Sequence, residues 1–151
     1  MTVRFGLVVR RSGATGPGGA NQLTVRMPSD LSVIEEAIEL VTGHCVDCLP
    51  DRATFNVRVA LGEALANAIQ YGNREDPTKH VEMRVRVDSR RIEIHVRDQG
   101  DGFDPTTVPD PTLPERVGEA NGRGIFLIRQ LVDDVSFNDR GNAICMVLNR
   151  V

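Results

Sequence analysis

The residues best placed to do chemistry begin on the polar back of a helix that the sequence predicts over residues 52–71. Glu63 and Asn67 lie one helical turn apart, opposite the apolar stripe of that helix. Their neighbours on this face are small or carry amides, and none is Lys or Arg, although helix faces in water are usually rich in long charged side chains. The face is either solvated or approached closely by a ligand.

A second group of residues follows a strand predicted over residues 92–98. Asp98 shares the parity of the apolar residues of this strand, so it ends the strand on the buried side. A buried carboxylate needs hydrogen-bond donors, and a ligand amine is one candidate. Gly100 and Gly102 come next and permit tight turns and close approach of the backbone. The pattern alone is also typical of a simple turn. Its place at the end of a strand, on the buried side, favours a ligand-binding site.

The third group is Gly122-Arg123-Gly124, at the start of a helix predicted over residues 124–132. Free backbone N–H groups at a helix start bind anions, and glycine lets a phosphate come close. The alternative is an ordinary junction between loop and helix. Residues 104–121 precede it, lack periodicity and hold four of the eight prolines, so we expect a lid that is mobile without ligand and ordered by it.

The elements that position these groups follow from the spacing of apolar residues. Helical spacing is found in three segments and alternation in five, and helices on one face of a mostly antiparallel sheet satisfy this order. The predicted fold is therefore an α/β sandwich of the α+β class, with a hairpin over 81–98. The glycine-rich residues 12–22 separate a weakly indicated first strand, within residues 1–11, from the rest of the chain. The chain is therefore divided into an N-terminal extension, 1–22, and a domain, 23–151. The helical segments are 29–41, 52–71 and 124–132, and the alternating ones are 23–27, 81–88, 92–98, 135–137 and 143–148.

Composition excludes several classes of protein. The 151 residues are 40% apolar and 26% charged, which is ordinary for one folded domain and argues against disorder. The net charge of −3 disfavours a nucleic-acid binder, and no apolar run approaches the ~18 residues of a membrane span. Because Arg10 and Arg11 follow the apolar N-terminal patch, a signal peptide is not expected and the predicted location is cytoplasmic.

The three cysteines do not form a disulfide framework. Cys45 and Cys48 have C-x-x-C spacing with His44 beside them. A zinc site would need two more ligands, and a redox motif would need a strand before it and a helix after it. We favour ordinary reduced thiols, with no metal expected there.

In their order along the chain, the three groups resemble the N, G1 and G2 boxes of the Bergerat-fold (GHKL) ATPases. Residues 62–68, 98–103 and 122–128, continued by Asp134-Val135, resemble the anti-sigma factor serine kinases of the RsbW and SpoIIAB type. The resemblance covers about residues 23–151. It implies the Bergerat ATP-binding fold, with ATP and Mg²⁺ as cofactors.

The resemblance also implies a role for each matching residue. Asn67 would ligate the Mg²⁺ that bridges the ATP phosphates, and Asp98 would accept a hydrogen bond from the adenine amino group. Glu63 would be the catalytic base that prepares a substrate hydroxyl. The implied ATP-binding residues, which shape the adenine pocket or open the helix that faces the phosphates, are Asn67, Asp98, Gly100, Gly102, Phe103, Gly122, Arg123, Gly124 and Ile125.

The implied function is that of an ATP-dependent serine/threonine kinase. Its partners would be a small antagonist protein of the STAS (anti-anti-sigma) type, which it phosphorylates, and a sigma factor, which it sequesters. Relatives are often homodimers, so a second copy is a further partner. The alternative is a nucleotide-dependent binding module without efficient phosphotransfer. A piece of a sensor histidine kinase is disfavoured, since no phosphoacceptor hairpin precedes the domain.

Three positions depart from the family pattern. Tyr71 stands where many relatives have a histidine. Gly141-Asn142-Ala143 replaces the usual Gly-Thr before the last strand, so one polar contact near adenine is either lost or made differently. Ala120 and Asn121 stand where some relatives carry a basic residue before the glycines, and Arg116 or Arg123 could substitute for it.

Overall fold

The computed structural model describes residues 2–4, 6–13, 19–45, 47–102 and 120–150, with the backbone alone at 2–4 and 120–123. The strands are β1 (Thr2–Arg4), β2 (Leu7–Gly13), β3 (Asn21–Pro28), β4 (His80–Val87), β5 (Arg91–Arg97), β6 (Asp134–Phe137) and β7 (Ala143–Asn149). The helices are the 3₁₀ turn η1 (Leu31–Val33), α1 (Ile34–His44), α2 (Asp51–Asn67), the π-helical turn η2 (Ala68–Gly72) and α3 (Ala120–Leu131).

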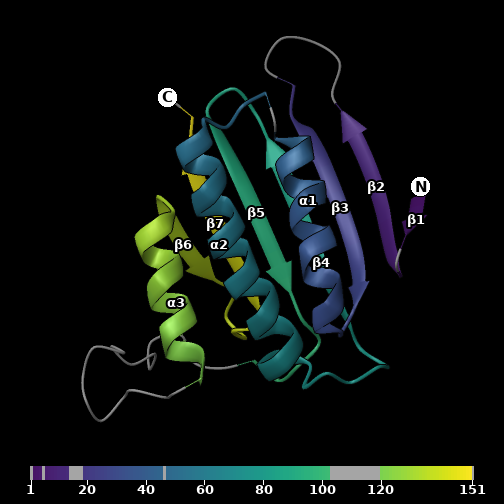
Figure 1. Cartoon of the computed structure of the whole chain (residues 1–151). Coiled ribbons are helices and arrows are strands. Elements are labelled where there is room, and N and C mark those ends of the chain that lie inside the picture. The colour runs from purple at the N-terminus through teal and green to yellow at the C-terminus, as the bar shows by residue number, and fades with distance from the viewer. Residues whose placement is uncertain (1, 5, 14–18, 46, 103–119, 151) are drawn as a thin grey trace.

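One sheet holds all of the described strands, in the order β1-β2-β3-β4-β5-β7-β6. Every neighbouring pair runs antiparallel. The helices α1, α2 and α3 lie side by side across one face of this sheet (Figure 1). The predicted α/β sandwich is therefore confirmed, and the core lies between the two layers.

The N-terminal part of the sheet is larger than predicted. The sequence pattern predicts about five strands, whereas the described residues form seven, because the first residues fold back as β1 and β2. Strand β2 pairs with β3 from Val8 opposite Arg26 to Gly13 opposite Asn21. Leu7 is completely buried in the common core. Part of the segment predicted to be flexible, residues 14–18, lies outside the described residues.

The β4–β5 hairpin brings Asp98 to the edge of the helical layer. Its buried positions alternate with exposed ones, and Val85 pairs with Ile94 in the middle of the register. The turn is closed by Asp88, whose carboxylate accepts hydrogen bonds from the backbone N–H groups of Arg90 and Arg91 at 2.8 and 2.9 Å. The buried face and the exposed face of this hairpin are those that the alternation of apolar and charged residues predicts.

Helix α2 is the central helix of the layer, flanked by α1 and α3 (Figure 1). Gly62 faces α1, and a Cβ there would lie in ordinary contact, 3.6 Å from Cδ1 of Ile38. Ala60 is one of the small neighbours of Glu63 on the polar back of this helix, yet it is only 1% exposed, because α2 is flanked on both sides. The buried residues of α2 and η2 are Val57, Ala60, Leu61, Ala64, Leu65, Ala68 and Ile69.

Candidate nucleotide site

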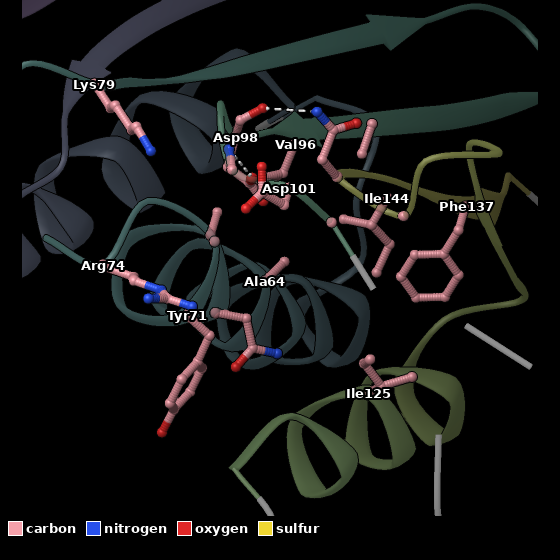
Figure 2. A pocket seen from close by; sticks show the side chains of 18 of the residues that line it. Ala64, Tyr71, Arg74, Lys79, Val96, Asp98, Asp101, Ile125, Phe137 and Ile144 are labelled. Carbon is pink, nitrogen blue, oxygen red and sulfur yellow. Dashed lines mark hydrogen bonds between the residues drawn. The ribbon is translucent and has the colours of Figure 1, made fainter. Parts of the chain in front are cut away.

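A cavity of about 220 Å³ lies where α2, α3 and the end of β5 meet. Its apolar wall is formed by side chains of both layers, among them Ala64, Val96, Ile125 and Ile144 (Figure 2). Its polar part includes Asn67 and Asp98, together with Lys79 and Asp101. A cleft that combines an apolar wall with convergent polar groups is typical of a small-molecule site. Five residues of the predicted ATP-binding set line it: Asn67, Asp98, Gly100, Gly102 and Ile125.

Asp98 is held in place by its own loop and by the start of β7. The N–H of Gly100 donates to Oδ1 of Asp98 at 2.8 Å. The backbone N–H of Asp98 donates to the carbonyl of Asn142 at 2.9 Å, and Nδ2 of Asn142 donates back to the Asp98 carbonyl at 3.2 Å. Burial raises the pKa of Asp98, while the Gly100 hydrogen bond and the charges of Lys79 and Arg140 act in the opposite direction. The carboxylate thus retains acceptor capacity that faces a cavity.

Asn142 shows what replaces the usual Gly-Thr in the segment Gly141-Asn142-Ala143. Its side chain is itself fixed, because Nδ2 of Asn138 donates to its Oδ1 at 2.6 Å. The polar residue in this position therefore holds the backbone of Asp98 and also lines the cavity. Tyr71, the other lining residue that departs from the pattern, turns its ring away from Asp98 (Figure 2).

Three glycines bring backbone segments together around Asp98. A Cβ at Gly72 would collide with the Asp98 carboxylate, and a Cβ at Gly100 would collide with the carbonyl of Gly72. Gly102 has φ +81°, and a Cβ there would collide with the carbonyl of Arg140. Only glycine fits these positions, because each backbone passes directly against another group. The sequence motif singles out Gly100 and Gly102, whereas it does not single out Gly72.

Helix α3 closes the opposite end of the site against Glu63 and Asn67. A Cβ at Gly124 would lie 2.8 Å from Nδ2 of Asn67 and 3.1 Å from Oε2 of Glu63. The structure therefore brings together three residues that are separated by up to 61 positions, counted from Glu63 to Gly124. Asn67 lines the cavity, whereas Glu63, one turn earlier on α2, lies beside it.

Helix α3 begins earlier than predicted, at Ala120 instead of Gly124. Gly122 and Arg123 thus lie in its first turn, where backbone N–H groups lack partners within the helix. Phe103 and most of the predicted lid, residues 104–119, lie outside the described residues. Their predicted roles stay predictions.

Two cations at the cavity were not singled out from the sequence. Arg74 and Lys79 both line it, and both come from the connection between η2 and β4 (Figure 2). Arg74 and Glu75 each have φ +54°, in the left-handed region that residues other than glycine rarely adopt. A loop without periodicity gave no signal that these side chains reach the site.

Comparison with known proteins decides the family. Residues 27–148 match the family model of the histidine kinase-like ATPase domain. The chain belongs to this family. The ATPase domain is also 35% identical over 117 residues to a protein of Bacillus licheniformis named serine-protein kinase RsbW, covering 72% of this chain and 70% of that one. The expected resemblance to Bergerat-fold ATPases and to kinases of the RsbW type is confirmed.

Two further relatives bear the same name. The RsbW of Bacillus subtilis is 33% identical over 101 residues, covering 60% of this chain and 61% of the relative. That of Oceanobacillus iheyensis is 28% identical over 99 residues, covering 61% and 62%. The chain thus spans 61% to 70% of the length of these three relatives. Among its described helices, none is both long and apolar enough to cross a membrane.

The side chains of this ATPase domain fit Mg²⁺ bound mainly by a nucleotide. The carboxamide of Asn67 lines the cavity, and its oxygen is a donor of the kind that Mg²⁺ takes. No cluster of three or more potential metal ligands occurs in the described part of the chain. Mg²⁺ at phosphate sites usually takes one or two protein oxygens and completes its shell with phosphates and water.

The cysteines of the ATPase domain lie apart from this chemistry. Cys45, Cys48 and Cys145 are free thiols. Burial raises the pKa of Cys45 to about 12, and neighbouring Cys48 contributes to the rise. Cys45 is therefore protonated at neutral pH, which is the opposite of a reactive thiolate.

Nucleotide affinity should fall in mild acid through Asp98. Because burial raises its pKa, this carboxyl protonates at a higher pH than an ordinary aspartate, and the neutral form loses the charge that attracts an adenine amino group. We expect the ADP affinities of the wild type and of Asp98→Asn to converge as the pH is lowered from neutrality toward the ordinary pKa of an aspartate. Titration of the phosphates affects both proteins equally, so a difference that stays constant over this range would disprove the prediction.

Proposed function

We propose that this chain is a Mg²⁺-ATP-dependent protein kinase that phosphorylates a serine or threonine of a small regulatory protein. The partner is a STAS-type antagonist, and in the absence of that antagonist the same domain holds a sigma factor. The names of the relatives support the kinase reaction. The sigma factor and the antagonist are what the resemblance in the three motifs implies.

One observation carries the proposal: the two ends of a single site have complementary chemistry. Asp98, at one end, offers a fixed carboxylate to a base, and Asn67, at the other, lies against Gly124 of α3. An adenine seated at Asp98 would direct its phosphates toward Asn67 and the first turn of α3. The N–H groups of that turn and the helix dipole favour phosphate oxygens.

Glu63 supplies the step that distinguishes a kinase from a nucleotide binder. It lies within one turn of Asn67, beside the cavity and not in its lining, so its carboxylate can meet a hydroxyl brought by a partner. It would orient that hydroxyl and take its proton as the bond to phosphorus forms. Bound Mg²⁺ would supply neutralisation of the phosphate charge. The nucleophile comes from the partner.

The test is incubation of the purified chain with γ-³²P-ATP, Mg²⁺ and a STAS-type protein from the same genome. The proposal predicts acid-stable label on a serine or threonine of the partner and none on the chain itself. Acid-labile label on the chain would indicate a histidine autokinase. ATP-dependent binding of the partner without transfer of label would establish the binding module instead.

A further inference from the structure

A completely buried asparagine lies directly behind the nucleotide site. Among the described residues, only Asn73 and Ser29 are polar and buried, at 0% and 5% exposure. Asn73 does not line the cavity, so it does not touch a ligand there. Burying an amide is costly unless its hydrogen bonds are made, which makes the partners of Asn73 informative.

The Asn73 side chain ties three separate segments together. Its Nδ2 donates to Oγ of Ser29 and to the carbonyl of His80, both at 2.9 Å. Its Oδ1 accepts the backbone N–H of Gln99 at 2.7 Å. Both amide hydrogens are therefore used, and the end of β3, the start of β4 and the loop after β5 meet at one side chain.

The third of these contacts reaches the site. Gln99 directly follows Asp98, and Oε1 of Gln99 also accepts the backbone N–H of His80 at 2.5 Å. Gly72, directly before Asn73, lies so close to the Asp98 carboxylate that a Cβ would collide with it. Gly72 and Asn73 thus contact Asp98 and Gln99, two consecutive residues against two consecutive residues.

The π-helical turn η2 explains how Asn73 reaches this position. The N–H of Asn73 donates to the carbonyl of Ala68 at 2.8 Å, five residues back. This turn is wider than an α-helical one, and such turns often occur at functional sites. It ends α2 immediately after Asn67 and carries the chain under the Asp98 loop.

We propose that Asn73 is a positioning residue for base selection, which rests on the proposed function. By fixing the N–H of Gln99, it fixes the direction of the Asp98 carboxylate. Adenine presents an amino donor to this carboxylate, whereas guanine presents the O6 acceptor in the same place. A fixed Asp98 carboxylate therefore attracts adenine and repels guanine. A carboxylate that is free to turn discriminates less between the two bases.

The test compares ADP and GDP affinities, by calorimetry with Mg²⁺, in the wild type, Asn73→Ala and Ser29→Ala. Ser29 belongs to the same network, since its Oγ also donates to the Lys79 carbonyl at 2.7 Å, but it does not contact Gln99. Both variants should lower Tm. Only Asn73→Ala should reduce the preference for ADP over GDP, by about fivefold or more, as expected for the loss of one hydrogen bond.

Each outcome has a distinct meaning. An unchanged ADP-to-GDP ratio in Asn73→Ala, or an equal change in Ser29→Ala, would show that Asn73 only stabilises the fold. A wild type that binds neither nucleotide would overturn the proposed function as well. If Asn73→Ala does not fold, Asn73→Ser replaces it, because its hydroxyl is too short to reach all three partners and adds no charge; the same loss of preference is expected.

Discussion

Glu63→Gln should slow phosphotransfer by a factor of about 10² to 10⁴, the usual contribution of a general base, while ATP and partner still bind. The amide keeps the size of the side chain and its place on α2 beside Asn67. It cannot take the proton of an incoming hydroxyl. The loss should therefore appear in the rate at saturating ATP and partner, measured as label transferred per unit time.

A matched control for this prediction is Glu39→Gln on α1. Glu39 forms an ion pair with Arg58 at 2.7 Å and is not among the residues that line the cavity, so the change should leave the transfer rate unaltered. Transfer at the wild-type rate by Glu63→Gln would exclude Glu63 as the base and would favour the binding-module alternative.

Gly72→Ala should reduce ADP affinity by about 150-fold, which corresponds to the ~3 kcal/mol upper value of a hydrogen bond to a charged group. The added Cβ would occupy the place of the Asp98 carboxylate, so this side chain has to leave its position. Calorimetric titration with ADP and Mg²⁺ measures the effect directly. The chemical change is one methyl group and does not alter a residue that binds the base.

Gly43→Ala is the control for this substitution. Gly43 lies in α1, and a Cβ there would meet nothing within 4 Å. Alanine is favoured over glycine in a helix by up to about 1 kcal/mol, so this variant should be slightly more stable and bind ADP normally. Normal ADP binding by Gly72→Ala as well would mean that the carboxylate of Asp98 does not recognise the base.

Local pattern was sufficient to predict much of the fold. The alternation of apolar and charged residues over 81–98 predicted the hairpin and correctly set Asp98 on the side of the helical layer. The helical spacing of the α2 stripe predicted its buried face. The N-terminal strands were less clear, since β1 is only three residues long and its pairing with β2 depends on a turn.

The site was predictable as residue types but not as geometry. The motifs identified Asn67, Asp98 and Gly124 from their chemistry and order. They could not show that Asn142 holds Asp98 across 44 positions, or that Asn73 holds Gln99 across 26, because such contacts arise only from tertiary packing. The π-helical turn that places Asn73 also has no periodic signal in five residues.

The central claim is that ATP binds in this cavity with its base at Asp98. Calorimetric titration of Mg²⁺-ATP into the wild type and into Asp98→Asn tests it most directly. The account predicts binding by the wild type and a loss of about 5- to 150-fold in the variant, as expected for weakening a charged hydrogen bond of ~1–3 kcal/mol. Equal affinity of the two proteins for ATP, or no binding by the wild type, would contradict it.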